Sequence, residues 1–149
     1  LFNVPFGKYK NPSIYNEKNL REASQLLKNT IIECANYQDL PEEFLTNSLI
    51  YFDPPYRPLS NTSSFTAYNK SNFNDNSQID LANYYKKISV NKNLYLILSN
   101  SDPKNSNKND NFFDDLYNGF NINRVSATRI INSKSEGRGK ITEILVTNK

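Results

Sequence analysis

The sequence predicts an α/β fold built on a mainly parallel β-sheet. Two observations support this fold class. Apolar runs of strand length alternate with segments of helical periodicity, and the most apolar run, residues 94–99, lacks polar alternation, as expected for a strand covered on both faces. The 149 residues are 37% hydrophobic and 13% aromatic, enough for one compact domain.

Helices are expected where apolar residues recur every three or four positions. Residues 17–28 place four apolar side chains on one helical face, namely Leu20, Ala23, Leu26 and Leu27. Residues 77–89 bring Ile79, Ala82, Tyr85 and Ile88 roughly into line. A third, short helix is expected over 110–118, before Gly119.

Strands are expected where short apolar runs lie between turn residues. These runs are 30–35, 48–52, 94–99, about 120–126 and 141–147. The last of them alternates as ITEILVT. The last two strands either extend the parallel sheet or form an antiparallel pair across the loop 127–140, and both arrangements stay open.

Composition excludes some classes of protein. The net charge of +3 is compatible with a polyanionic partner without requiring one. No apolar run reaches the ~18 residues of a membrane span and no signal peptide is visible, so a cytoplasmic protein is expected. The chain has no His, so we expect no metal site, although carboxylates alone can bind Mg or Ca. Cys34 lies beside Ile31, Ile32 and Ala35, which predicts a buried thiol.

The segment Asp53-Pro54-Pro55-Tyr56 directly follows the predicted strand 48–52. In open α/β sheets, ligands bind outside the carboxyl ends of the strands. Each proline fixes its own φ and favours an extended residue before it, so Asp53 and Pro54 are both expected to be extended. The loop would then offer the Asp53 carboxylate and the Pro54 carbonyl as acceptors, with the Tyr56 ring beside them.

This set of groups suits an exocyclic amino group on a conjugated ring. Two acceptors can bind both N–H groups, favour a more nucleophilic nitrogen and stabilise the positive charge that develops as a methyl group arrives. Tyr56 can stack on a base that has left its duplex, a contact worth roughly 1–3 kcal/mol. The same tetrapeptide also occurs as an ordinary turn that closes a strand, and that interpretation stays open for the tetrapeptide alone.

Four segments together resemble the Dam-type family of DNA adenine N6-methyltransferases. They are FNVPFGKYKNP at 2–12, YFDPPYRPLSNTSSFTAY at 51–68, ILSNS at 97–101 and ATRIINSKSEGRGKITEILVTN at 127–148. The resemblance implies a partial Rossmann-like methyltransferase fold, S-adenosyl-L-methionine as the methyl donor without a metal, and double-stranded DNA as the partner. It implies that residues 1–149 are the C-terminal part of the methyltransferase domain, with the end of a DNA-contacting hairpin at 1–12 and the catalytic sheet at 30–149.

The resemblance also assigns roles to individual residues. The catalytic set is Asp53, Pro54, Pro55 and Tyr56, and Asp53 also lies against the cofactor. Ser99 and Asn100 are expected to line the pocket, although such a pair is also a common turn. The DNA-binding set is Pro5, Gly7, Lys8, Tyr9, Lys10, Arg138 and Lys140, for which a solvated basic surface is the alternative.

Part of the family's pattern is missing from this sequence. The chain starts at Leu1 without any Met, and its four glycines form no Gly-rich turn between a strand and a helix, so an upstream cofactor-binding part is expected to exist. The strands of this upstream part would lie in the sheet between the strands expected at 30–35 and 48–52. Without them, the chain alone is expected to bind S-adenosylmethionine weakly or not at all. The alternatives are methylation of cytosine N4 or of a protein glutamine, and an inactive remnant or complementing subunit. A GATC-like target follows from the resemblance only.

Overall fold

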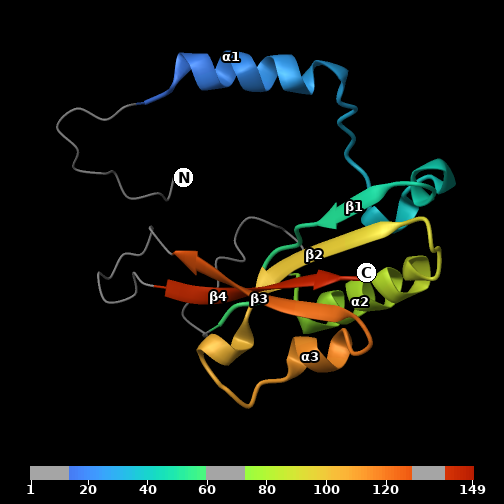
Figure 1. Cartoon of the computed structure of the whole chain (residues 1–149), viewed down its shortest axis with the longest axis vertical. Helices are drawn as coiled ribbons and strands as arrows, with labels where there is room; N and C mark the ends of the chain where they lie inside the picture. The colour runs from blue at the N-terminus through green and yellow to red at the C-terminus, as the bar shows by residue number, and fades with distance from the viewer. Residues whose placement is uncertain (1–13, 60–72, 129–139) are drawn as a thin grey trace. The chain divides into compact units, whose positions relative to one another are not determined.

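The computed structural model describes residues 14–59, 73–128 and 140–149 (Figure 1). The chain divides into two compact units, Leu1–Ala35 and Asn36–Lys149. The DNA-binding residues expected before Pro12, together with Arg138, lie outside the described residues. The second unit contains the sheet and the candidate site.

The second unit is a small α/β domain on a four-stranded mixed sheet. Its strands are β1 (Leu49–Phe52), β2 (Tyr95–Ser101), β3 (Asn121–Thr128) and β4 (Lys140–Thr147), in the spatial order β1-β2-β4-β3 (Figure 1). β1 and β2 are parallel, whereas β4 is antiparallel to both of its neighbours, β2 and β3. The predicted α/β class is confirmed, and so are these four strands to within three residues.

The prediction of a mainly parallel sheet is wrong for the described strands, because two of their three pairings are antiparallel. The chain length between β3 and β4 explains the difference. A parallel connection takes about a dozen or more residues, usually as a helix, and 129–139 is too short for one. β3 and β4 therefore pair as a hairpin, which is the antiparallel alternative that the sequence left open.

Helix α2 (Asp75–Ser89) connects the parallel strands β1 and β2 and covers one face of the sheet. It begins at the N-cap Asn74, whose side chain accepts a hydrogen bond of 3.1 Å from the Ser77 N–H. The buried residues of α2 are Gln78, Leu81, Ala82, Tyr84, Tyr85 and Ile88. Ile79, expected on this face, is 37% exposed, because it lies outside the arc of α2 that the buried residues occupy.

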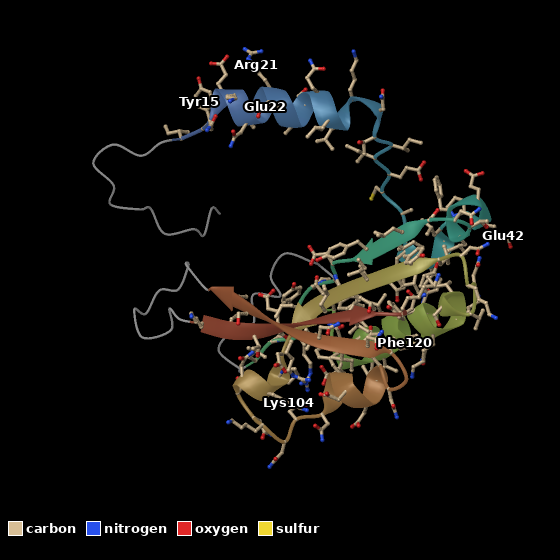
Figure 2. The ribbon with its side chains drawn as sticks, in the orientation of Figure 1. Tyr15, Arg21, Glu22, Glu42, Lys104 and Phe120 are labelled. Atoms are coloured by element: carbon tan, nitrogen blue, oxygen red, sulfur yellow. The ribbon has the colours of Figure 1, made fainter. Side chains whose placement is uncertain are left out.

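Aromatic rings fill the layer between α2 and the sheet. Tyr85 is fully buried, and its ring centroid lies 5.8 Å from that of Phe52, 5.5 Å from that of Tyr117 and 5.0 Å from that of Phe120. Figure 2 labels the Phe120 side chain at this position. Tyr117 follows the short helix α3 (Phe112–Leu116), so its contact with Tyr85 places α3 on the same side of the sheet as α2. The short helix predicted over 110–118 is thereby confirmed.

The opposite face of the sheet carries the alternate residues of β1 and β2. Leu49 is 63% exposed, Tyr51 54% and Tyr95 56%, whereas Phe52, Leu96 and Leu98 face α2 and are buried. β1 forms one edge of the described sheet.

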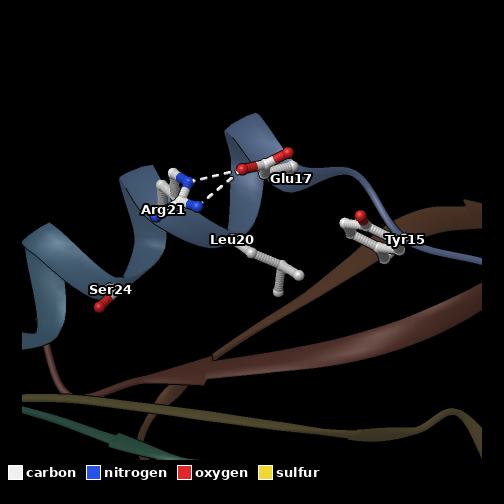
Figure 3. A pocket seen from close by; sticks show the side chains of 5 residues that line it. All are labelled: Tyr15, Glu17, Leu20, Arg21 and Ser24. Atoms are coloured by element: carbon white, nitrogen blue, oxygen red, sulfur yellow. Dashed lines mark hydrogen bonds and ion pairs between the residues drawn. The ribbon is translucent and has the colours of Figure 1, made fainter.

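The first unit contains helix α1 (Glu17–Leu26), continued by a 3-10 turn over Leu27–Asn29. Asn16 caps it by accepting a hydrogen bond of 3.1 Å from the Asn19 N–H, and Arg21 pairs with Glu17 one turn earlier at 2.7 Å. Figure 3 shows this pair beside an open pocket lined by Tyr15, Glu17, Leu20, Arg21 and Ser24. The predicted helix is confirmed, although its apolar residues Leu20, Leu26 and Leu27 remain more than half exposed.

Two expectations for the first unit are wrong. Residues 30–35 form no strand, and Cys34 is exposed rather than buried. A strand requires a partner that supplies ladder hydrogen bonds, and none of the described residues provides one for this segment. Ile31 is 74% exposed and Ile32 83%, so these two neighbours do not bury Cys34. None of the described helices is long and apolar enough to cross a membrane.

Candidate active site

The Asp53-Pro54-Pro55-Tyr56 loop leaves β1 at its carboxyl end, beside the carboxyl half of β2. The register pairs Phe52 with Leu98, so Asp53 and Ser99 follow side by side on parallel strands. The Ser99 hydroxyl donates a hydrogen bond of 3.1 Å to Oδ1 of Asp53. Ser99 is only 5% exposed, whereas Asp53 is exposed. A buried hydroxyl therefore orients a carboxylate that remains open to a ligand.

Tyr56 lies at the same edge of the sheet and is partly open to solvent. It is 37% exposed. Partial desolvation raises the pKa of the Tyr56 hydroxyl, the nearby Ser99 hydroxyl opposes this shift, and the negative charges of Glu143 and Asp53 add to it. The phenol therefore stays protonated at neutral pH. Tyr56 can offer an uncharged aromatic face beside the Asp53 carboxylate.

Side chains from α2 and β2 bind the backbone of the loop. Gln78 Nε2 donates to the Pro55 carbonyl at 3.0 Å, and the Arg57 N–H donates to Asn100 Oδ1 at 3.0 Å. The Ser101 hydroxyl donates to the Arg57 carbonyl at 2.6 Å. These contacts satisfy the carbonyls of Pro55 and Arg57 and the N–H of Arg57 from outside the loop.

The Arg57 side chain anchors the end of the loop. It binds Asp75 through Nε and Nη2, at 2.9 and 3.0 Å, and Asp110 through Nη1 at 2.8 Å. Its guanidinium carbon lies 4.2 Å from the centroid of the Phe112 ring. Hydrogen bonding to Asp75 raises the Arg57 pKa further, against the opposing effect of burial. Two carboxylates neutralise this cation and tie the end of the loop to α2 and to the segment before α3.

A second polar cluster fixes the strands behind the site. Asp102 follows β2 and is 1% exposed. Its Oδ2 accepts hydrogen bonds from Thr142 Oγ1 at 2.7 Å and from Arg124 Nε at 3.1 Å. Arg124 also binds both carboxylate oxygens of Asp114, at 3.0 and 2.8 Å. This cluster ties β2, β3 and β4 together where β2 ends.

The structure brings one group of expected site residues together. Asp53, Pro54, Pro55 and Tyr56 lie in one loop, and Ser99 and Asn100 contact that loop directly. Lys140 begins β4 and is exposed. The remaining expected DNA contacts lie outside the described residues, namely Pro5, Gly7, Lys8, Tyr9, Lys10 and Arg138.

Sequence reasoning missed Gln78, Arg57 and Ser101. One signal for Gln78 was available, because it opens the helical series 78, 81, 82, 85 that faces the core, where a polar residue requires a partner. No pattern marked the contacts of Arg57, since Asp75 and Asp110 are 18 and 53 residues away in sequence.

Fold and site together define an α/β protein whose acceptor-rich loop, at the carboxyl end of a parallel strand, is suited to an amino-group methyltransferase. The chain belongs to the family of D12 class N6 adenine-specific DNA methyltransferases, whose sequence profile matches residues 1–131. The resemblance found from the four motifs is thereby confirmed.

Relatives in three organisms support the same membership. The chain is 48% identical over 148 residues to the type II methyltransferase M.MjaIII of Methanocaldococcus jannaschii, covering 99% of this chain and 49% of that protein. It is 39% identical over 149 residues to the type II methyltransferase M1.LlaDCHI of Lactococcus lactis subsp. cremoris, covering 99% and 50%. It is 34% identical over 144 residues to the DNA adenine methylase of Vibrio cholerae, covering 97% and 49%.

The chain thus spans about half the length of the curated relatives that it matches. No solved structure matches it.

Proposed function

We propose that this chain forms the part of a DNA adenine N6-methyltransferase that holds the target adenine by its amino group. The observation that carries the proposal is the exposed Asp53 carboxylate at the carboxyl end of β1. The Ser99 hydroxyl orients this carboxylate through a hydrogen bond of 3.1 Å to Oδ1, and Tyr56 follows in the same loop. Membership of the adenine-specific family supports adenine as the base. The relatives' names support DNA as the substrate.

In this proposal, Asp53 and the Pro54 carbonyl accept the two N–H groups of adenine N6. Their negative and partial negative charges stabilise the positive charge that develops on N6 as it is methylated. Tyr56 stacks on the extruded base, because the amino group cannot be attacked while it is paired in the duplex. Asp53 need not be a strong base, since the methylated ammonium product is acidic and loses its proton late, to Asp53 or to water.

When bound, S-adenosyl-L-methionine would supply the methyl group from its sulfonium and would leave as the thioether. We assign Asp53 to the binding of this cofactor. The Asp53 carboxylate is exposed at the carboxyl end of a strand, where ligands bind in open α/β sheets. Gly119, the one glycine among the described residues, has φ +95° and lies in the turn before β3, so it does not serve a strand-to-helix cofactor turn. The chain therefore fits one side of the cofactor site.

DNA contacts are proposed for the basic residues at both ends of the chain. Lys8, Lys10, Arg138 and Lys140 would bind phosphates, and Pro5, Gly7 and Tyr9 would shape the first of these segments. Phosphate contacts position a protein on DNA without reading its sequence. We further propose that residues 1–149 act as the C-terminal part of a methyltransferase domain, in which 1–12 contacts DNA. The segment 30–149 would supply the catalytic sheet, whose first described strand begins at Leu49.

A chimera with a relative tests this function. In the chimera, residues 1–149 replace the half of M.MjaIII that they match. The 48% identity between the two sequences favours correct folding of the chimera. The purified chimera is incubated with labelled S-adenosylmethionine and duplex DNA, and the modified nucleosides are separated by mass. We expect N6-methyladenine.

Each alternative function has its own outcome in this experiment. N4-methylcytosine would replace the adenine assignment, and methylation of added protein instead of DNA would replace DNA as the substrate. A folded chimera that binds S-adenosylmethionine but transfers no methyl group would favour the inactive remnant. The chain alone, titrated with S-adenosylmethionine in a calorimeter, should show weak or no binding. Micromolar affinity would refute the proposal that this chain supplies only one side of the cofactor site.

A further inference from the structure

Two buried amide side chains outside the catalytic tetrapeptide face each other across α2 and β2. Gln78 is 1% exposed and Asn100 is fully buried. Asn100 Nδ2 donates a hydrogen bond of 3.1 Å to Gln78 Oε1. Buried amides are costly unless they are hydrogen-bonded, so the other groups of this pair require partners of their own.

Those partners belong to the candidate catalytic loop. Gln78 Nε2 donates to the Pro55 carbonyl at 3.0 Å, and Asn100 Oδ1 accepts from the Arg57 N–H at 3.0 Å and from the Ser101 N–H at 2.9 Å. The two loop contacts lie one residue before and one residue after Tyr56. The amide pair therefore holds the backbone on both sides of the residue proposed to stack on the base.

The direction of each hydrogen bond is determined by the backbone. The Pro55 carbonyl can only accept, so it requires the NH₂ group of Gln78, which leaves Oε1 of Gln78 to accept from Asn100. The Arg57 N–H can only donate, so it requires Oδ1 of Asn100. Neither amide can be inverted without placing two donors or two acceptors together.

We infer that Gln78 and Asn100 are positioning residues, which act through the loop backbone to set the orientation of Tyr56 and Asp53 without touching the substrate. The catalytic consequence rests on the proposed function. Misplacement of a reacting group by about 1 Å can reduce the rate about 10²-fold even when the change lies away from the chemistry. A side chain that only filled the core would have no such effect.

The decisive variant is Gln78→Met, which keeps the length and burial of the side chain but removes the donor to Pro55. Asn83→Met is the matched control, because Asn83 lies on the same helix and is exposed. Both are made in the full chain and in the chimera. Gln78→Glu is the second variant, since it keeps the shape of glutamine but presents a carboxylate to the Pro55 carbonyl.

Two readouts keep this inference separate from the proposed function. In the full chain, hydrogen exchange of the Arg57 amide reports loop order directly, and we expect roughly tenfold faster exchange in Gln78→Met than in Asn83→Met. In the chimera, kcat should fall about 10- to 100-fold in Gln78→Met while KM for DNA stays close to that of the unsubstituted chimera. Thermal unfolding establishes that both variants are folded.

Unchanged exchange at Arg57 together with unchanged kcat would overturn the inference, and so would a kcat that falls only in proportion to the unfolded fraction. If the unsubstituted chimera transfers no methyl group, the proposed function fails, and exchange at Arg57 still decides whether the amide pair orders the loop.

Discussion

Ser99 binds the Asp53 carboxylate at 3.1 Å although 46 residues separate them in sequence. The parallel pairing of β1 with β2 makes this contact possible, because it aligns Phe52 with Leu98 and so brings the next residue of each strand together. α2 is the connection that allows the two strands to run parallel. The candidate site is thus a direct product of the β1-α2-β2 topology.

Replacing Ser99 by Ala should weaken methyl transfer without unfolding the domain. A hydrogen bond of this kind contributes about 1.5 kcal/mol or more when one partner is charged, so kcat/KM of the chimera should fall about tenfold. Ser89→Ala is the control, since its hydroxyl binds a helix carbonyl at the exposed end of α2. Equal kcat/KM in the two variants would contradict the proposed role of Ser99 in orienting Asp53.

The two buried tyrosines beside each other should respond oppositely to loss of the hydroxyl. Tyr85 donates to the Leu96 carbonyl at 3.1 Å, whereas the Tyr117 hydroxyl has no hydrogen-bond partner in the described part of the chain. Tyr85→Phe should therefore cost about 1 kcal/mol, and Tyr117→Phe should be neutral or stabilising. Urea unfolding of the full chain measures both, and a larger loss for Tyr117→Phe would disprove the assignment of the two hydroxyls.

Alkaline pH should destabilise the domain through the same two side chains. Burial raises the pKa of Tyr85 and of Tyr117 above the ordinary value of about 10. Below pH 10 both states keep their protons. As the pH rises past 10 the unfolded state loses protons that the folded state retains, so unfolding becomes easier. Urea midpoints measured from pH 8 to 11 should fall above pH 10, and they should fall less steeply in Tyr117→Phe than in the unsubstituted chain. Equal pH slopes of the midpoint in the two proteins would contradict this explanation.

Asp102 should be among the most sensitive positions for stability. Removing its carboxylate leaves Arg124 and Thr142 without the buried acceptor that joins three strands. Asp102→Ala should reduce the free energy of unfolding by about 3 kcal/mol, whereas Asp115→Ala, at an exposed position on α3, should change it by less than about 0.5 kcal/mol. Similar losses in the two variants, measured by urea unfolding, would show that the cluster does not tie the strands together.

Much of the fold could be predicted because it follows from local patterns. The alternation in 141–147 and the apolar run at 94–99 required only the periodicity of a strand, and the confirmed helix at Glu17–Leu26 required only that of a helix. The mixed pairing of the sheet was harder to predict, since it depends on whether the connection 129–139 is long enough for a crossover. Residues 30–35 have a strand-like sequence, but pairing is a property of two segments, and the described residues contain only one of them.

The candidate site was predictable to the extent that its chemistry is local. Asp53, Pro54, Pro55 and Tyr56 are adjacent in sequence, so their combination of acceptors and an aromatic ring could be recognised directly. The residues that hold this loop come from α2 and β2, and only the folded structure brings Gln78, Asn100 and Ser101 to its backbone. Arg57 shows the limit most clearly, because the two carboxylates that neutralise it, those of Asp75 and Asp110, lie 18 and 53 residues away in sequence.

The most direct test of the central claim is the single-turnover rate of methyl transfer in the chimera with Asp53→Ala. If Asp53 binds the adenine amino group, the rate of methyl transfer should fall to background, by about 10³-fold or more. The affinity for nonspecific DNA should stay close to that of the unsubstituted chimera. A folded Asp53→Ala chimera that methylates adenine at a near-normal rate would contradict the account.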